Sequence, residues 1–148
     1  MRSDSQFTVA IHTLILVEYY RDESITSDLV ARSIGCNPVI VRNVFTKLSK
    51  AGILNPGMGR KKTELAVPAD RITLRDVFAA TQSLHVEHMF GMYAPNSQCP
   101  VGPDIHRILT DRLENARDSI LKELEGTTIA DMVSDIPPGR GLPPINRE

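Results

Sequence analysis

The sequence predicts a mainly α-helical fold with a small β-hairpin wing, that is, a winged helix-turn-helix followed by a long C-terminal helix. Three helical patterns in the first third of the chain are separated only by short polar turns. A short hairpin pattern with glycines and a basic tip comes next. Later, one helical pattern runs over residues 103–125 without a break, which favours a single long helix.

Start and stop signals mark the first three helices. Apolar residues spaced three and four apart predict a first helix over about residues 5–20, with Ser5 as its cap. A threonine-serine pair begins the second helix, and Gly35 ends it. Asn37, followed by a proline at the first helical position, begins a third helix that runs to about Lys50.

A hairpin and a fourth helix follow. Ile53 begins a strand, residues 55–59 form a turn and loop, and residues 63–67 form the return strand. Thr73 caps a helix that covers about residues 74–83. The basic residues at the hairpin tip are Arg60, Lys61 and Lys62.

The second half of the chain is dominated by the long helix, Pro103 to Glu125. Residues 84–103 are harder to place, and we expect them to be partly helical and then loop. The apolar stripe of the long helix is wider than a lone surface helix needs. The stripe comprises Ile105, Ile108, Leu109, Leu113, Ala116, Ile120, Leu121 and Leu124.

These patterns divide the chain into three parts. Residues 1–83 are expected to form a winged helix-turn-helix domain, and residues 84–134 a linker and dimerisation helix region with a last short helix. Residues 135–148 carry most of the prolines of the second half and are expected to be a flexible Pro-rich tail.

Charge is distributed unevenly along the 148 residues, although the net charge is only −1. Residues 1–75 carry 11 Lys and Arg against 7 Asp and Glu, whereas residues 76–148 carry 6 against 11. Phosphate attraction is local, so a basic first half is compatible with DNA binding. The sequence has neither a secretory signal pattern nor a membrane-spanning run, so we expect a cytoplasmic protein whose two cysteines are free thiols.

The third helix has the composition of a helix that binds in the DNA major groove. If its apolar side is buried, the opposite side presents a mixture of groups that can contact bases and phosphates. Arginine can pair with guanine and asparagine with adenine, while the start of the helix could hold a phosphate through backbone N–H groups. The candidate residues are Asn37, Val39, Arg42, Asn43, Thr46, Lys47 and Lys50.

The wing supplies a second candidate contact. Gly57 and Gly59 let the backbone approach DNA closely, and Arg60, Lys61 and Lys62 can follow phosphates or enter a narrow minor groove. Three adjacent basic residues on a loop can also be an ordinary solvated tip. Their place directly after a helix-turn-helix pattern favours the DNA contact.

Several motifs together resemble the Rrf-two family of bacterial transcriptional regulators. They are TSDLVARSIGCNPVIVRNVFTKLSKAGIL (26–54), RITLRDVFAAT (71–81) and CPVG (99–102), and the resemblance covers about residues 5–134. It implies a winged-helix homodimer, joined through the long helix, that binds partly palindromic operators and usually represses. By resemblance, Val39, Arg42 and Asn43 contact bases and the wing near Arg60 enters the minor groove.

The cysteines depart from the pattern of the cluster-binding members. Those members carry three cysteines in the loop before the long helix, whereas this chain has only Cys99 there and Cys36 in the helix-turn-helix turn. We therefore expect no cofactor, an iron–sulfur cluster included.

Two kinds of sensor remain open. Cys99 precedes a helix start, which favours the reactive thiolate, and Cys36 adjoins the third helix, so oxidation of either could change DNA affinity. Cys36 could equally be a small buried hydrophobic residue. His85 and His88 could join Cys99 in a zinc site, but ordinary polar roles are favoured and we expect no metal.

Other function classes fit less well. The sequence contains no phosphate-binding glycine loop with its lysine and no nucleophile elbow, so an enzyme is not expected. The main alternative is a winged-helix module that binds a protein or a small ligand instead of DNA. The charged third helix and wing argue against it, because a protein-binding face should be apolar.

Overall fold

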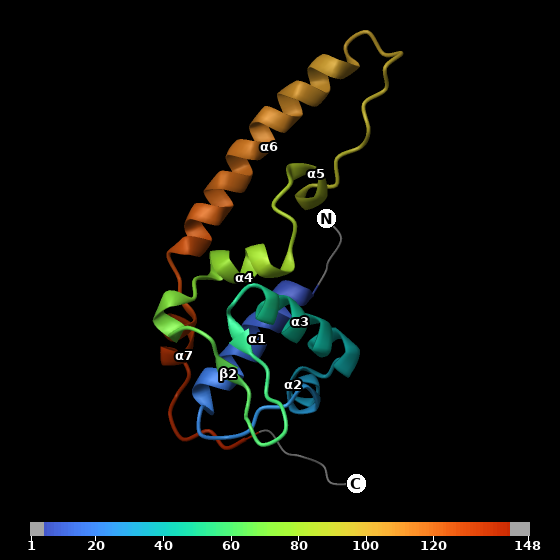
Figure 1. Ribbon diagram of the computed structural model, residues 1–148. Coiled ribbons are helices and arrows are strands. Elements are labelled where there is room, and N and C mark those ends of the chain that lie inside the picture. Colours follow the sequence, from blue (N-terminus) through green and yellow to red (C-terminus); the bar gives the residue numbers. More distant parts are fainter. Residues whose placement is uncertain (1–4, 143–148) are drawn as a thin grey trace.

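The computed structural model describes residues 5–142 and consists of a helical head from which one long helix projects (Figure 1). This is the predicted fold class, mainly helical with a two-stranded hairpin. The elements, in chain order, are α1 (Gln6–Tyr19), α2 (Ser27–Ile34), α3 (Pro38–Lys50), β1 (Leu54–Asn55), β2 (Glu64–Leu65), the 3-10 turn η1 (Ala69–Arg71), α4 (Leu74–Thr81), α5 (Val86–Met89), α6 (Gly102–Glu125) and α7 (Ile129–Ser134).

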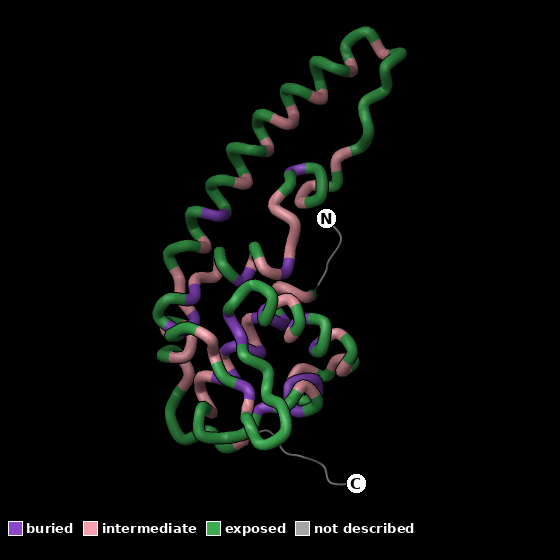
Figure 2. The backbone as a smooth tube through the Cα atoms, in the orientation of Figure 1, coloured by how far each residue is buried: buried purple, intermediate pink, exposed green. Residues whose placement is uncertain are grey.

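The head is built around α1, which contacts α2, α3, α4, α7 and β2. Leu14 of α1 is fully buried among residues that come from both ends of the chain, including Val44 of α3 and Ile129 of α7. The ring of Phe7 packs edge-on against that of Phe78 in α4, with centroids 5.1 Å apart. Figure 2 shows that buried residues concentrate in the head and that α6 is mostly exposed.

The predicted signals at the ends of α2 and α3 are confirmed. The Thr26 hydroxyl accepts a 3.1 Å hydrogen bond from the Leu29 N–H at the start of α2. Gly35 follows α2 with φ of +81°, a conformation that glycine adopts without strain. Ser5 occupies the N-cap position of α1 as expected, but its hydroxyl makes no cap hydrogen bond, and its carbonyl accepts from the Thr8 hydroxyl.

The hairpin is shorter than predicted. β1 and β2 are antiparallel, with Leu54 opposite Leu65, and each has only two residues. Pro56 follows β1 directly and has no N–H to donate, so the ladder cannot continue past it. The turn η1, which follows Pro68, was not predicted by any pattern.

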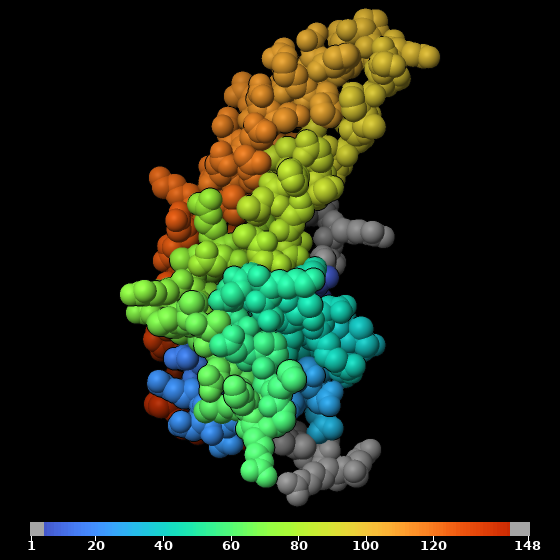
Figure 3. Space-filling model, in the orientation of Figure 1, coloured from blue at the N-terminus to red at the C-terminus, as the bar shows by residue number. Residues whose placement is uncertain are grey.

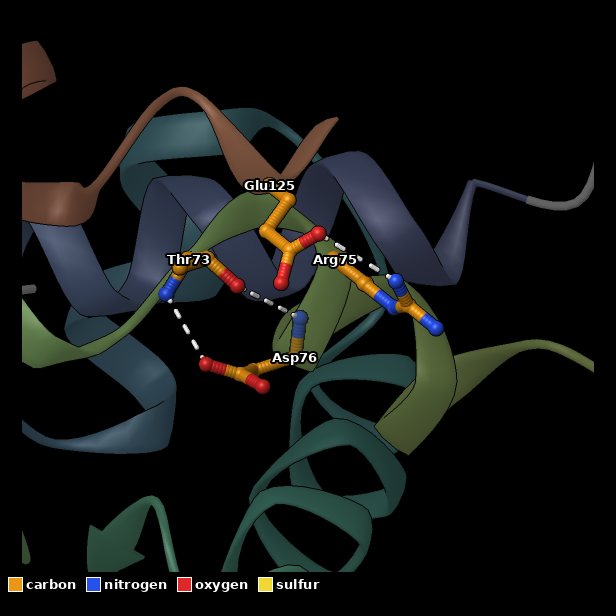
Figure 4. Close-up of polar contacts among 4 residues, drawn as sticks. All are labelled: Thr73, Arg75, Asp76 and Glu125. Carbon is orange, nitrogen blue, oxygen red and sulfur yellow. Dashed lines mark hydrogen bonds and ion pairs between the residues drawn. The ribbon is translucent and has the colours of Figure 1, made fainter. Parts of the chain in front are cut away.

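A junction of two capping boxes fixes the base of α6 to the head. The Thr73 hydroxyl accepts from the Asp76 N–H at 3.1 Å, and the Asp76 carboxylate accepts from the Thr73 N–H at 3.0 Å (Figure 4). Thr128 and Asp131 form the same pair of bonds at the start of α7. Backbone hydrogen bonds join the two caps, and an Arg75–Glu125 ion pair of 3.3 Å closes the junction.

The segment after α7 returns to the end of α1. The Tyr19 hydroxyl donates to the Pro137 carbonyl, and the Tyr20 hydroxyl donates to the Gly141 carbonyl, each at 2.7 Å. Leu142 packs against the core of the head. The predicted flexible tail, residues 135–148, thus includes a part that is bonded to the end of α1, and residues 143–148 lie outside the described residues.

The long helix α6 projects away from the head, and the extended segment that follows α5 leads to its far end (Figure 1). The helix α6 begins one residue before the predicted start, Pro103, and ends at Glu125 as predicted. Within residues 5–142, no helix is both long and apolar enough to cross a membrane.

Candidate nucleic-acid interface

The third helix, α3, is positioned by the burial of one side. Val41, Val44 and Leu48 are fully buried against the head, as the helical spacing predicts. The opposite side therefore faces solvent, and it carries Arg42, Asn43, Thr46 and Lys50. Val39 lies at the start of α3 with 52% of its surface exposed. The helix offers a continuous polar surface with one apolar residue near its N-terminus.

Lys47 differs from the other candidate residues of α3. It is half-buried, and its ammonium group donates a hydrogen bond to the side-chain oxygen of Gln6 in α1. The lysine therefore joins two helices of the head. It lies at the border of the exposed surface, while Lys50, one turn later, is fully exposed.

The start of α3 does not offer the predicted row of N–H groups for a phosphate. Pro38 has no N–H, and the Val39 N–H donates to the Asn37 side-chain oxygen at 2.9 Å. The Ile40 N–H donates to the Asn37 carbonyl at 3.0 Å. Asn37 is therefore a helix cap, and its side-chain oxygen is already used within the protein.

The wing loop is held by hydrogen bonds across its neck. The Gly57 N–H donates to the hydroxyl of the buried Thr63 at 3.1 Å, and the Lys61 N–H donates to the Met58 carbonyl at 3.0 Å. A Cβ atom on Gly57 would lie 2.5 Å from the Lys61 carbonyl oxygen, so only glycine fits there. Gly59 has φ of +61°, the left-handed conformation that glycine tolerates.

The three basic residues of the wing are not equivalent. Arg60 and Lys61 are exposed at the tip, and the wing projects at the lower edge of the surface in Figure 3. Lys62 is half-buried, and its ammonium group donates to the carbonyl oxygen of Arg21, just past the end of α1. Sequence reasoning also omitted Met58, an exposed apolar residue of the same loop, because an isolated methionine carries no charge or spacing signal.

The candidate sensor residues lie at opposite ends of the molecule. Cys36 is half-buried in the turn between α2 and α3, and Cys99 is half-buried in the loop before α6. That loop lies at the end of α6 that is remote from the head (Figure 1). His85 and His88 lie edge to face with ring centroids 6.0 Å apart, and His88 is hydrogen-bonded to Ser83. No group of three or more His, Cys, Asp or Glu side chains suited to a metal occurs in the described part of the chain.

The predicted apolar stripe of α6 is covered by the chain itself only in part. Leu121 is buried within the chain itself, so it does not belong to an outward-facing surface. Leu109, Leu113 and Leu124 are half-buried. Ile105, Ile108 and Ile120 are exposed to 43%, 50% and 41%, and Ala116 is exposed beside them. These four residues form an outward apolar surface that the chain itself does not cover.

His12 connects α1 to the helix-turn-helix, a role that sequence reasoning did not assign. Its Nε2 atom lies 2.9 Å from the Ser33 hydroxyl of α2. Burial lowers the pKa of His12, because a charged imidazolium loses hydration there. The neutral imidazole therefore joins the two helices.

Comparisons with known proteins agree with this geometry. A model of the Rrf2 family, the Rrf-two family named above, matches residues 3–135 and is described as an iron-dependent transcriptional regulator. The chain is 34% identical over 139 residues to YwnA of Bacillus subtilis strain 168, a candidate HTH-type transcriptional regulator, covering 90% of this chain and 98% of that protein.

Two crystal structures are also similar. A candidate transcriptional regulator from Lactobacillus plantarum superimposes with a TM-score of 0.74 at 26% identity, covering 88% of this chain and 89% of the other. A candidate DNA binding protein superimposes with a TM-score of 0.71 at 31% identity, and the match covers 86% of this chain and 98% of the other.

Proposed function

Because the chain belongs to the Rrf2 family of bacterial transcriptional regulators, we propose that it is a sequence-specific repressor that binds a partly palindromic operator as a homodimer. One observation carries the proposal. The exposed polar side of α3 and the exposed basic tip of the wing both belong to the same head, whose apolar side chains are buried. A helix for the major groove and a wing for the adjacent groove are the two contacts that this architecture uses.

The side chains of α3 divide by chemistry. Arg42 can pair with two acceptors of guanine, Asn43 can pair with adenine, and Val39 can contact a thymine methyl group. Thr46 and Lys50 lie further along the helix and are suited to phosphates. The Thr46 hydroxyl donates to the Arg42 carbonyl at 3.1 Å within the protein, so it would exchange this bond for one that it donates to a phosphate oxygen.

The homodimer is supported by the outward apolar surface of α6. Ile105, Ile108, Ala116 and Ile120 would pack against the same residues of a second copy, as a two-fold interface requires. Two heads joined in this way would contact two half-sites of opposite orientation. A partly palindromic operator follows from that symmetry.

A binding experiment tests the proposal. We would select duplexes from a random pool with the purified protein, then titrate the selected duplex and a scrambled one at several salt concentrations. Arg42→Ala should abolish the preference for the selected duplex, while Lys61→Ala should weaken both duplexes alike. Lys122→Ala removes an exposed cation from α6 and serves as the control, since it should change neither quantity. Failure of the wild-type protein to bind either duplex at low salt would refute DNA binding.

Repression is tested separately in cells. A reporter gene placed behind the selected duplex should be less active when the protein is present, because a dimer on the duplex would block the polymerase. The Arg42→Ala variant should restore expression to the level without the protein. Increased reporter activity with the wild-type protein would mean that it is an activator.

The residues present do not fit the iron–sulfur cluster that the family description suggests. Cysteine thiolates are the usual cluster ligands, and the loop before α6 has only Cys99, while Cys36 lies in the head. We therefore propose that the protein regulates without a cluster. Anaerobic incubation with ferrous iron and sulfide should leave DNA affinity and visible absorbance unchanged.

The proposal also includes a response to oxidation, in which oxidation of a cysteine lowers the affinity for DNA. Cys36 lies beside α3, and its N–H donates to the Ala31 carbonyl in the turn, so a bulkier oxidised sulfur there would disturb the helix. DNA affinity should fall on treatment with peroxide and recover with a thiol. Cys36→Ser and Cys99→Ser, tested singly, should show which thiol responds, and an unchanged response in both would exclude thiol sensing.

A module that binds a small ligand remains the alternative. An open groove of about 700 Å³ lies between the end of α1, β2, η1 and α7. Its walls mix apolar and charged residues, and the charged ones are Glu18, Arg21, Asp22, Lys62, Glu64 and Asp70. A small ligand that binds there, combined with no binding of the wild-type protein to any duplex, would favour this alternative.

A further inference from the structure

Met58 is the most exposed large hydrophobic residue in the described chain, with 84% of its surface accessible. It lies in the wing loop, two residues before Arg60. A flexible apolar side chain gains no stabilisation from such a position within the folded protein. In the wing loop this side chain is therefore available to whatever the wing contacts.

We propose that Met58 is a minor-groove contact that inserts its thioether side chain between the sugar walls of bound DNA. This inference rests on the proposed DNA binding and extends it to a residue that contributes through shape. The minor groove is narrow and lined by deoxyribose, so a slender apolar side chain can pack within it. Methionine is unbranched and adapts to irregular surfaces.

The wing backbone fixes where Met58 lies. The residue before it is Gly57, whose N–H is bonded to Thr63 and whose hydrogen faces the Lys61 backbone too closely for any Cβ. The carbonyl of Met58 accepts from the Lys61 N–H, and Gly59 completes the turn in the left-handed conformation. The loop is therefore preorganised, and the side chain of Met58 meets DNA with little further loss of backbone entropy.

The charges next to Met58 favour DNA as the molecule that the wing tip contacts. Arg60 and Lys61 are exposed in the same turn, and their cations can contact phosphates along the edges of the groove. Lys62 is bonded to the Arg21 carbonyl, which connects the base of the loop to the end of α1. The tip therefore presents one apolar group beside two cations, a combination that suits a groove with apolar walls and anionic edges.

A second copy of the chain fits the wing tip less well than DNA does. The neighbours of Met58 are glycines and cations, so the loop has no continuous apolar patch of the kind that protein interfaces contain. The chain already has such a surface on α6, where Ile105, Ile108 and Ile120 are exposed.

Three substitutions test the inference on the duplex selected above. Met58→Ala shortens the side chain, Met58→Gln makes it polar at similar length, and Met58→Leu keeps it apolar. We expect Met58→Ala and Met58→Gln to lower the DNA affinity about tenfold, which is the scale of removing an apolar side-chain contact. The affinity of Met58→Leu should stay within about threefold of the wild-type value. Because no charge changes, the salt dependence should stay that of the wild-type protein.

Hydroxyl-radical footprinting supplies a readout that affinity alone does not. These radicals attack deoxyribose from the minor groove, so the wild-type protein should protect a short stretch on the outer side of each half-site. Met58→Ala should lose that protection but still protect guanine N7 from dimethyl sulfate, which reports the contact of α3 in the major groove. The thermal midpoints of all three variants should match that of the wild type, since 84% of the surface of Met58 is exposed within the folded chain.

Other outcomes overturn the inference in distinguishable ways. If the wild type binds its selected duplex and the Ala and Gln variants bind equally well with the same footprint, Met58 does not contact DNA, although the proposed function stands. A change of oligomeric state in Met58→Ala would assign the residue to a contact between copies. Absence of wild-type binding to any duplex would remove the proposed function and this inference together.

Discussion

Neighbouring side chains of the same type have different roles at the interface because the fold uses some of them internally. Lys47 donates to Gln6 and Lys62 donates to the Arg21 carbonyl, whereas Lys50 and Lys61 are exposed. The sequence places all four lysines on candidate contact surfaces. Only the packing of α1 against α3 and the wing distinguishes the lysines that stabilise the head from those available to phosphates.

The two wing lysines should therefore respond differently to truncation. Lys61→Ala should reduce the slope of log affinity against log salt by about one, because one phosphate contact is lost. Lys62→Ala should leave the slope unchanged and lower the thermal midpoint slightly. Fluorescence titrations from low to moderate salt measure the slope, and equal slopes for the two variants would contradict the assignment.

His12 should make stability depend on pH. Burial lowers its pKa from the ordinary value of 6.5, so the unfolded chain binds a proton that the folded chain resists. The free energy of unfolding should therefore be highest above pH 6.5 and should fall as the pH drops below that value. His12→Gln should flatten this part of the profile in urea titrations. His85→Gln, at an exposed position, is the control and should keep the wild-type profile.

At the scale of elements, prediction succeeded where a local signal has one physical meaning. Asn37 before Pro38, Gly35 after α2 and Thr73 before α4 all mark helix ends, since each satisfies backbone groups or permits a left-handed residue. Prediction failed where the outcome depends on distant partners. The turn η1 and the contact of the C-terminal segment with Tyr19 are set by packing that no local pattern encodes, whereas the short hairpin has a local cause in Pro56.

The capping boxes at the α4–α7 junction should contribute measurably to stability. Thr128→Ala removes the hydroxyl that accepts from the Asp131 N–H, and loss of such a cap costs about 1 kcal/mol. Urea unfolding should show this loss. Thr8→Ala is the matched control, because its exposed hydroxyl donates within α1 and caps nothing. If both variants lost the same free energy of unfolding, the cap hydrogen bond would contribute no more to stability than an exposed hydroxyl does.

The contacts between α1 and the C-terminal segment can be tested by proteolysis. Trypsin cleaves after Arg140, whose N–H donates to the Tyr19 hydroxyl at 3.1 Å. Tyr19→Phe and Tyr20→Phe remove the hydroxyls that hold this segment, so both should accelerate cleavage there. Mass spectrometry of timed digests follows the fragment that lacks residues 141–148. Tyr93→Phe, on the loop before α6, should leave the rate unchanged.

At the scale of the whole molecule, the chain leaves the head and returns to it. A division after residue 83 follows local patterns, yet Ile129 of α7 is fully buried in the head and α7 contacts α1 and η1. The helix α6 is thus attached at its base by elements on both sides of it in sequence. A movement of two α6 helices relative to each other would therefore be transmitted to the heads through a firm junction.

The outward surface of α6 leads to the last prediction, which concerns assembly. Ile108→Glu places a carboxylate on the most exposed of the three isoleucines, and burying it against a second copy would be strongly unfavourable. Sedimentation should show a monomer, with a thermal transition still present because the head packs around residues other than Ile108.

Operator affinity of the monomer should fall far more than tenfold, since the two half-sites would then be bound independently. Lys122→Gln changes the net charge by the same amount at an exposed position outside the four-residue apolar surface, and it should remain a tight-binding dimer. If Ile108→Glu stays dimeric, the two copies meet elsewhere. If it is monomeric and still binds the full operator as tightly as the wild type, one head suffices for recognition, and the palindromic operator is no longer required by the architecture.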